Sequence, residues 1–257
     1  MNVVIVGSGN VATVLAKVIH KAGHEIVQIL GRNENRAKVL ANTYNATWGS
    51  FKSTPYSNAD LYILAVSDNS LSHLDLYQNL GKKIVLHTAG SVSMEVLQDL
   101  SENFGILYPL QTLTKGSEDI YSLPFLINGS SDTVKEFVES FAKTLSPNVS
   151  YASDQERLKY HIAAVFVNNF TNHLYAIAED FCSKEEIDFK KLFPLIRETT
   201  DKVMKDSPKN VQTGPALRED IYTMGRHLQM LTSQPDIKYL YLKLSESILK
   251  FHQKDQQ

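Results

Sequence analysis

One stretch decides the fold expected of this chain: Val3-Val4-Ile5-Val6-Gly7-Ser8-Gly9-Asn10-Val11-Ala12. The four β-branched residues before the first glycine are typical of a strand buried in a parallel sheet. After the turn, apolar residues recur at helical spacing as far as Ile19. Strand, glycine-rich turn and helix therefore follow one another in the order that a dinucleotide-binding unit requires.

The small residues of this turn each have a steric role. Gly7 permits the tight turn, Gly9 lets the backbone approach a pyrophosphate, and Ala12 lets the helix pack on the strand. Unpaired N–H groups at the helix start also favour a negative charge. A glycine-rich turn can be only a turn, but the order of elements here favours a binding site. The residues predicted to contact the dinucleotide at this turn are Gly7, Ser8, Gly9, Asn10, Val11 and Ala12.

Composition indicates a globular protein of ordinary kind. The 257 residues are 43% hydrophobic and 21% charged, with a formal net charge of −2. This charge gives no electrostatic reason to expect a nucleic acid or an anionic membrane as partner. Cys182 is the only cysteine, so an intrachain disulfide is excluded and a reducing compartment is favoured. We expect a cytoplasmic protein without a membrane span, and no residue spacing is typical of a metal site.

Strand and helix patterns alternate over the first part of the chain. Such alternation predicts an α/β fold with a doubly wound, mainly parallel sheet covered on both faces. The segments predicted as strands are residues 3–6, 25–30, 46–48, 60–66, 83–87, 105–108, 124–127 and 149–151.

After residue 151 only helical patterns remain. They cover residues 154–181, 189–204, 215–231 and 237–252. We therefore expect two domains, a dinucleotide-binding domain over residues 1–152 and an all-helical domain over residues 153–257. The helical domain is expected to supply the second wall of a substrate site.

The end of the second predicted strand bears on the choice of cofactor. NAD-binding units carry an acidic residue there that binds the ribose hydroxyl. The chain has Arg32 and Asn33 at this place, with Arg36 nearby, and no carboxylate. An arginine offers a fork of donors suited to a 2′-phosphate. Exposed arginines at strand ends are common, but the missing acid favours NADP(H) as cofactor.

Ligands of open α/β sheets bind outside the carboxyl ends of the strands. By this rule Val66 and Ser67 are expected to line the adenine and ribose side. His87, Thr88 and Gln111 follow later strands and are candidate substrate contacts near the nicotinamide. Residues 87–91 fit a capped turn before a helix over residues 94–100 equally well.

The helix predicted from residue 154 holds two candidate catalytic residues. Asn169 interrupts an apolar stripe, formed with Leu158, Ile162 and Val165, that the spacing predicts to be buried. Hydride transfer to a carbonyl or imine needs a proton donor beside the reacting atom. His161 can supply the proton while Asn169 orients substrate or nicotinamide. A single histidine on a helix is more often structural.

Thr213 and Arg218 are further candidate substrate contacts. The run from Thr213 through Pro215 has the residues of a helix start. Arg218 is suited to anchor a carboxylate or phosphate. Alternatively, Arg218, Asp220 and His227 form a structural network, and both interpretations stay open.

These segments resemble a known family, proteins that join a Rossmann-like domain to a DUF2520 helical domain and are named NADP oxidoreductases. They are related to pyrroline-5-carboxylate reductase, F420-dependent NADP reductase and 6-phosphogluconate dehydrogenase-like proteins. The matching segments span both domains and are residues 7–12, 64–68, 87–91, 108–112 and 160–169, with Thr213, Gly214, Pro215, Arg218, Asp220 and His227. The resemblance implies an NADP-binding domain, a helical domain that forms a homodimer, and no established substrate.

One departure from related enzymes matters for mechanism. β-Hydroxyacid dehydrogenases place a catalytic lysine four residues before the asparagine of this helix. Here Val165 has that position and Lys159 is out of register. Two functions therefore stay open. The first is an NADP(H)-dependent oxidoreductase acting on a small polar, anionic metabolite; the second is a non-catalytic NADP(H)-binding sensor or regulatory dimer.

Overall fold

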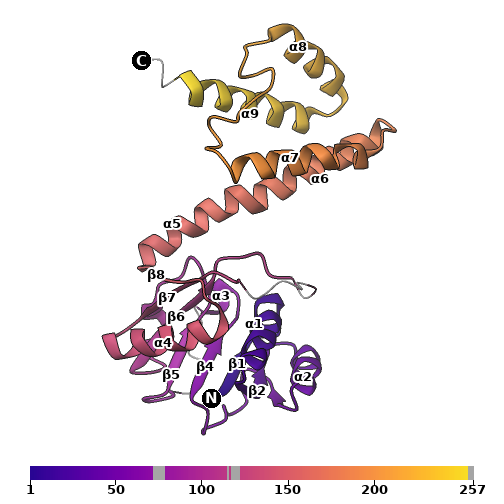
Figure 1. Cartoon of the computed structure of the whole chain (residues 1–257). Coiled ribbons are helices and arrows are strands. Elements are labelled where there is room, and N and C mark those ends of the chain that lie inside the picture. Colours follow the sequence, from indigo (N-terminus) through magenta and orange to yellow (C-terminus); the bar gives the residue numbers. More distant parts are fainter. Residues whose placement is uncertain (72–78, 115, 117–121, 254–257) are drawn as a thin grey trace. The chain divides into compact units, whose positions relative to one another are not determined.

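The computed structural model describes all residues except 72–78, 115, 117–121 and 254–257 (Figure 1). The chain divides into two compact units, Met1–Phe170 and Thr171–Gln257. The boundary between the two units lies within the helical stretch predicted over residues 154–181. The domain boundary expected between residues 152 and 153 stays a prediction.

An eight-stranded sheet forms the centre of the N-terminal unit, with strand order β3-β2-β1-β4-β5-β6-β7-β8. All neighbouring strands run parallel except the antiparallel pair β6 and β7. The prediction of a Rossmann-like, mainly parallel sheet is thereby confirmed. The strands are β1 (Asn2–Val6), β2 (Glu25–Leu30), β3 (Thr47–Gly49), β4 (Leu61–Leu64), β5 (Ile84–His87), β6 (Asn103–Pro109), β7 (Phe125–Gly129) and β8 (Val149–Tyr151).

Hydrophobic cores cover both faces of this sheet. Val3 and Ile5 of β1 join a core with α1 (Asn10–Lys21), α2 (Glu34–Asn42) and α4 (Asp132–Leu145). Val4 and Val6 join a core on the other face. Successive side chains of a strand point to opposite faces, so the run of β-branched residues fills both cores.

Two short helical segments lie beside that second core. They are α3 (Asp68–Leu71) and the 3₁₀ turn Met94–Leu97. The predicted helix over residues 94–100 is therefore shorter than expected. Its start is as expected, because the Ser93 side chain accepts a hydrogen bond from the backbone N–H of Glu95.

The predicted helix over residues 154–181 consists of three segments. These are α5 (Asp154–Ala164), a π-helical segment (Val165–Phe170) and α6 (Thr171–Lys184). A capping box of Ser153 and Glu156 begins α5. A π turn has more residues per turn than an α-helix, so the 3.6-residue period used for prediction does not hold across residues 165–170.

The described part of the C-terminal unit contains helices and no strand, as predicted. After α6 come α7 (Phe193–Val203), α8 (Ile221–Met230) and α9 (Pro235–Gln253). The prediction that a helix begins at Pro215 is wrong. Gly214 and Glu219 have positive φ angles, 113° and 52°, which interrupt a helix, and the Asp220 side chain caps α8 instead.

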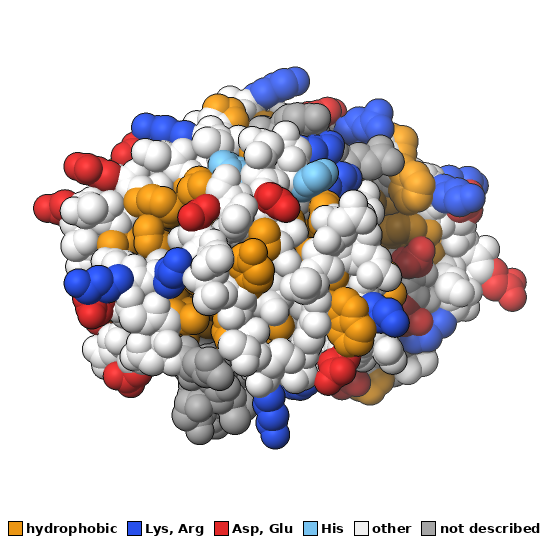
Figure 2. Space-filling model, turned by 90° about the horizontal axis from the view of Figure 1, so that it is seen from below, with side chains coloured by type: hydrophobic (Ala, Val, Ile, Leu, Met, Phe, Trp, Pro, Cys, Tyr) orange, Lys and Arg blue, Asp and Glu red, His pale blue; other side chains and the backbone are white. Residues whose placement is uncertain are grey.

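No helix within the described residues has the length and apolar character needed to span a membrane. Figure 2 shows one face of the molecule, on which basic and acidic side chains are interspersed.

Candidate functional site

The turn after β1 requires glycine at its first position. Gly7 has φ = 139°, and a Cβ atom there would lie 2.1 Å from the carbonyl oxygen of Ala65. The Gly7 N–H donates to the carbonyl oxygen of Leu30 over 2.7 Å. The turn is therefore held between the ends of β2 and β4, the two strands that flank β1.

Helix α1 begins without a side-chain cap. Gly9 is its N-cap residue, no side chain caps it, and the first turn holds no acidic residue. A Cβ atom on Gly9 would meet no atom of the described chain within 4 Å. Asn10 is exposed, Ser8 and Val11 are half-buried, and Ala12 is buried. Uncapped N–H groups therefore face an open space suited to an anion.

Arg32 and Asn33 follow β2 and are exposed. The Asn33 side-chain oxygen caps α2 by accepting a hydrogen bond from the Arg36 N–H over 3.0 Å. Within the described residues neither arginine forms an ion pair. A hollow of about 350 Å³ adjoins this place, lined by Ser8, Thr13, Asn35, Arg36, Val39, Leu40 and Thr43. Free guanidinium groups beside a hollow suit a phosphate group.

Residues at the end of β4 lie on the same edge of the sheet. Val66 is half-buried, and the Ser67 hydroxyl lies 2.8 Å from the Ser70 hydroxyl. Asp68 accepts a short hydrogen bond from the Ser91 hydroxyl, which links this turn to the loop after β5.

His87 is fully buried at the end of β5. Its Nδ1 accepts from the Ala89 N–H over 3.1 Å, and its Nε2 lies 3.3 Å from the Ser93 carbonyl oxygen. Burial, together with the positive charge of Arg157, lowers the pKa of His87 to about 4. The neutral ring therefore connects Ala89 and Ser93 within the loop that follows β5. Thr88 is also buried, with its hydroxyl 3.5 Å from the Leu64 carbonyl oxygen.

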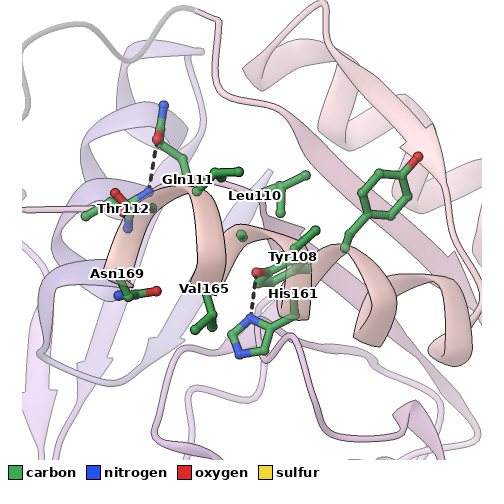
Figure 3. A pocket seen from close by; sticks show the side chains of 12 residues that line it. Tyr108, Leu110, Gln111, Thr112, His161, Val165 and Asn169 are labelled. Atoms are coloured by element: carbon green, nitrogen blue, oxygen red, sulfur yellow. Dashed lines mark hydrogen bonds between the residues drawn. The ribbon is translucent and has the colours of Figure 1, made fainter. Parts of the chain in front are cut away.

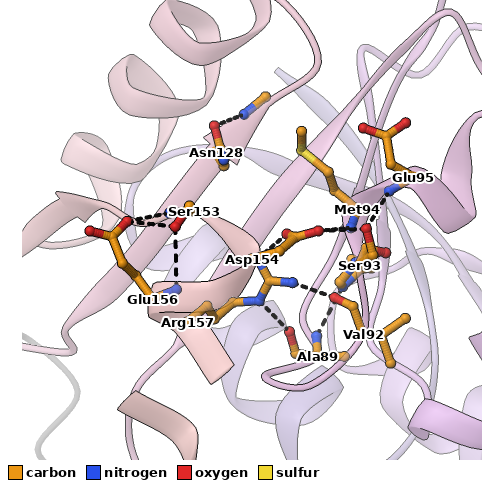
Figure 4. Close-up of polar contacts among 12 residues, drawn as sticks. Ala89, Val92, Ser93, Met94, Glu95, Asn128, Ser153, Asp154, Glu156 and Arg157 are labelled. Carbon is orange, nitrogen blue, oxygen red and sulfur yellow. Dashed lines mark hydrogen bonds and ion pairs between the residues drawn. The ribbon is translucent and has the colours of Figure 1, made fainter. Parts of the chain in front are cut away.

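A buried arginine joins the start of α5 to this loop (Figure 4). Arg157, only 1% exposed, pairs with Asp154 over 2.7 Å and donates to the carbonyl oxygens of Ala89 and Val92. Arg157 was not among the site residues predicted from the sequence. Its only sequence signal is the position three residues after an aspartate in the first turn of a helix.

Asp154 completes the connection. Its Oδ2 accepts from the Ser93 hydroxyl over 2.5 Å and from the Met94 N–H over 3.1 Å. Burial alone would raise the pKa of Asp154, but the hydrogen bonds from Ser93 and Arg157 lower the pKa below its ordinary value. The carboxylate is thus kept ionised.

His161 meets the sheet one helical turn beyond Arg157. Its Nδ1 lies 3.1 Å from the Tyr108 hydroxyl oxygen (Figure 3). A Cβ atom on Gly90 would lie 2.7 Å from this Nδ1 and 3.0 Å from Cζ of Tyr108. Only glycine at position 90 lets both rings approach. The predicted segments 87–91, 108–112 and 160–169 are therefore brought together.

Tyr108 and His161 border a cavity of about 570 Å³. The Thr112 hydroxyl accepts a short hydrogen bond from the Asn168 amide, and the Gln111 side chain accepts from the Thr112 N–H over 3.0 Å. Within the described part of the chain, the lining contains no carboxylate, lysine or arginine. It consists of Tyr108, Leu110, Gln111, Thr112, Tyr160, His161, Ala163, Ala164, Val165, Val167, Asn168 and Asn169.

The stripe around Asn169 is not buried as expected. Leu158 is 41% exposed, Ile162 is 51% exposed, and Asn169 is exposed as well as lining the cavity. The reason is that the buried side of α5 is the side of Arg157. Its guanidinium finds an aspartate and two carbonyl oxygens, which compensate the burial of its charge.

Thr213 and Arg218 belong to the C-terminal unit, where both are exposed in the segment before α8. Asp220 binds the N–H and hydroxyl of Thr223, which lower the pKa of its carboxyl. His227 lies 2.9 Å from the Tyr241 hydroxyl. Asp220 and His227 have different hydrogen-bond partners, but the charges of Arg218 and His227 also lower the pKa of Asp220. The network of these residues and the roles of Thr213 and Arg218 stay predictions. Among the described residues, no group of His, Cys, Asp and Glu could hold a metal ion.

Two protein families match the sequence. Residues 2–90 match the family described as NADP oxidoreductase, coenzyme F420-dependent. Residues 123–248 match a domain of unknown function, DUF2520. Among curated proteins, no sequence matches the chain.

Solved structures share the fold over nearly the whole chain. A protein from Bacteroides fragilis named “putative NADP oxidoreductase” is 38% identical, with a TM-score of 0.89 over 97% of this chain and 98% of that chain. A reductive aminase from Aspergillus terreus, in complex with NADPH and ethyl-5-oxohexanoate, is 17% identical, with a TM-score of 0.68 over 97% and 93%. A 1-pyrroline-5-carboxylate reductase from Streptococcus pyogenes is 14% identical, with a TM-score of 0.63 over 97% and 98%. The last two are similar in fold alone.

Proposed function

Because this chain belongs to the family of NADP oxidoreductases that join a Rossmann-like domain to a DUF2520 domain, we propose that it is an NADP(H)-dependent oxidoreductase. Its reaction is hydride transfer to or from a small polar, anionic metabolite. One observation carries this proposal. The uncapped turn at Gly9 comes directly after β1, and the cavity beside His161 is lined by residues at the end of β6. Both therefore lie at the carboxyl edge of the same sheet.

The residues of the turn fit a dinucleotide. The backbone N–H groups of residues 7–12 bind the pyrophosphate, because no side chain or acidic residue competes for them. Arg32 and Asn33 bind the 2′-phosphate, the group that distinguishes NADP from NAD. Val66 and Ser67 line the adenine and ribose side. The bound cofactor supplies the hydride.

The cavity holds the reacting part of the substrate. His161 is the source or the acceptor of the proton that the reaction transfers, and Asn169 orients the substrate or the nicotinamide. Gln111 lines the cavity and contacts the substrate. His87 and Thr88 are buried, and they affect substrate binding by shaping the loop after β5. Since the described lining has no lysine or arginine, His161 is the residue of this cavity that meets the charge of an anionic substrate. Thr213 and Arg218 of the C-terminal unit remain candidate substrate contacts.

The protein acts as a homodimer in the cytoplasm. The C-terminal unit exposes large apolar side chains, among them Met204, Ile221 and Tyr222. Apolar side chains of this size are typical of an interface between subunits. The buried free thiol of Cys182 agrees with a reducing compartment.

Calorimetric titration with NADPH tests the cofactor site. Gly9→Asp places a carboxylate beside the pyrophosphate and should abolish detectable binding. Asn42→Asp, an exposed position of α2, adds the same charge elsewhere and should leave the affinity unchanged. Equal NADPH affinity in the wild type and in Gly9→Asp would refute the site.

Turnover distinguishes an enzyme from a sensor. We expect NADPH oxidation with a member of a panel of keto acids and cyclic imines, followed by absorbance. Tight NADPH binding without oxidation by any of these compounds, accompanied by a change in partner binding, would favour the non-catalytic sensor.

A further inference from the structure

We propose that the Tyr108 hydroxyl is the group that delivers the proton to the substrate, and that His161 then reprotonates the Tyr108 oxygen. This inference rests on the proposed oxidoreductase function and adds a residue to its mechanism. Tyr108 and His161 both line the cavity, and their hydroxyl oxygen and Nδ1 are 3.1 Å apart.

The position of Tyr108 is set by the sheet. It lies in β6, between β5 and β7, and its ring is buried. The ring of His161 meets the ring of Tyr108 edge-on, at an interplanar angle of 72°. The missing side chain of Gly90 leaves the space in which the two rings meet. A group carried by a central strand is held more rigidly than one carried by a loop, as proton transfer requires.

The other lining residues offer few alternatives. Among the described residues, no carboxyl, ammonium or thiol group lines the cavity, and the second phenol of the lining, Tyr160, is 52% exposed. The Thr112 hydroxyl already accepts a hydrogen bond from Asn168, and an alcohol is a much weaker acid than a phenol. Burial raises the pKa of the Tyr108 phenol, so that at neutral pH it still carries its proton.

The proposed proton transfer acts on a substrate with a C=O or C=N bond. As the carbon accepts hydride, the π electrons of this bond move to the heteroatom. The O–H bond of Tyr108 breaks and a bond from the heteroatom to hydrogen forms. The protonated imidazole of His161 gives its Nδ1 proton to the Tyr108 oxygen. His161 then regains a proton from water after the product leaves.

A cofactor-free measurement tests the contact on which this step depends. In ¹⁵N NMR spectra of the histidine rings, Tyr108→Phe should change the Nδ1 signal of His161. Tyr62→Phe is the matched control, because Tyr62 is a buried tyrosine of β4 whose hydroxyl donates to the Tyr56 carbonyl oxygen, away from the cavity. An unchanged His161 signal in Tyr108→Phe would overturn the inference.

Kinetics then test the role in proton transfer. With NADPH and the best substrate of the keto acid and imine panel, Tyr108→Phe should lower kcat about 100-fold, the effect of losing a general acid. NADPH affinity should stay unchanged, and Tyr62→Phe should keep full activity. The double variant Tyr108→Phe, His161→Ala should be no slower than Tyr108→Phe, since both residues serve one step.

The outcomes separate the two proposals. A wild type that oxidises NADPH, together with a Tyr108→Phe variant of equal kcat, would overturn the role of Tyr108 and leave the oxidoreductase in place. A wild type that binds no NADPH, or oxidises none, would overturn both.

Discussion

The Nε atom of Arg157 donates to the carbonyl oxygen of Ala89, 68 residues earlier, over 3.1 Å. Because Arg157 lies in the first turn of α5 and Ala89 in the loop after β5, this bond fastens the helix to the carboxyl edge of the sheet. His161 lies one turn further along α5 and is thereby carried to Tyr108 and Gly90. A buried arginine in this protein thus determines where the candidate catalytic histidine lies.

Replacing Arg157 should destabilise the N-terminal unit. Arg157→Met would leave the Ala89 and Val92 carbonyl oxygens and Asp154 without their charged partner. We expect a loss of about 3 kcal/mol in the free energy of unfolding, the lower end for a broken buried pair because Asp154 is one-third exposed. Urea unfolding measures it, with Lys159→Met, an exposed position on the same helix, as control. A loss no larger than that of the control would contradict the prediction.

His87 should make stability depend on pH. Its folded pKa of about 4 lies below the ordinary value of 6.5, so the unfolded chain binds a proton that the folded protein does not. Its contribution to stability is therefore complete above pH 6.5 and lost as the pH falls towards 4, by about 3 kcal/mol in total.

Urea unfolding between these pH values checks this effect. His87→Gln, which keeps one donor and one acceptor but does not titrate, should show a smaller decline than the wild type. His173→Gln, at an exposed position, should decline like the wild type. Parallel curves for His87→Gln and the wild type would show that His87 is not the titrating group.

Two glycine substitutions should have opposite effects. Gly7→Ala would place a methyl group against the Ala65 carbonyl oxygen at a positive φ angle, and should cost about 2 kcal/mol or more as well as NADPH binding. Gly225→Ala, inside α8 with no atom near the added methyl, should stabilise by up to about 1 kcal/mol. Thermal unfolding compares the two. A Gly7→Ala protein as stable as the wild type would refute the strain argument.

Arg32 should decide between the two nicotinamide cofactors. Arg32→Ala removes charged hydrogen bonds worth about 1.5–3 kcal/mol, and should weaken NADPH binding about 10–100-fold. NADH, which lacks the 2′-phosphate, should bind as before. Lys38→Ala removes a charge from the exposed side of α2 and should affect neither cofactor. Calorimetry measures both affinities. Equal losses for NADPH and NADH would contradict a contact to the 2′-phosphate.

Local patterns predicted most of the fold. The β-branched run of β1, the turn at Gly7 and the alternation of strands with helices depend on neighbours in sequence, and the sheet follows them closely. Errors arose where tertiary or special backbone geometry intervened. The helix expected at Pro215 begins at Ile221, and the π segment before Thr171 alters the helical period.

The candidate site was predicted only in part. Glycine spacing pointed to the turn, and polar residues at strand ends pointed to segments 87–91 and 108–112. The burial of Arg157 could not be predicted, because arginines are mostly exposed unless their charge is compensated.

The sequence alone determined the order of strands and helices and the glycine-rich turn, since these depend on steric limits and periodicities within a few residues. Only the tertiary structure decided that Tyr108 and His161 meet at one cavity, with Gly90 packed against both rings. Their contact requires three separate segments to pack together, and it depends on ion pairing and hydrogen bonds between residues far apart in the chain.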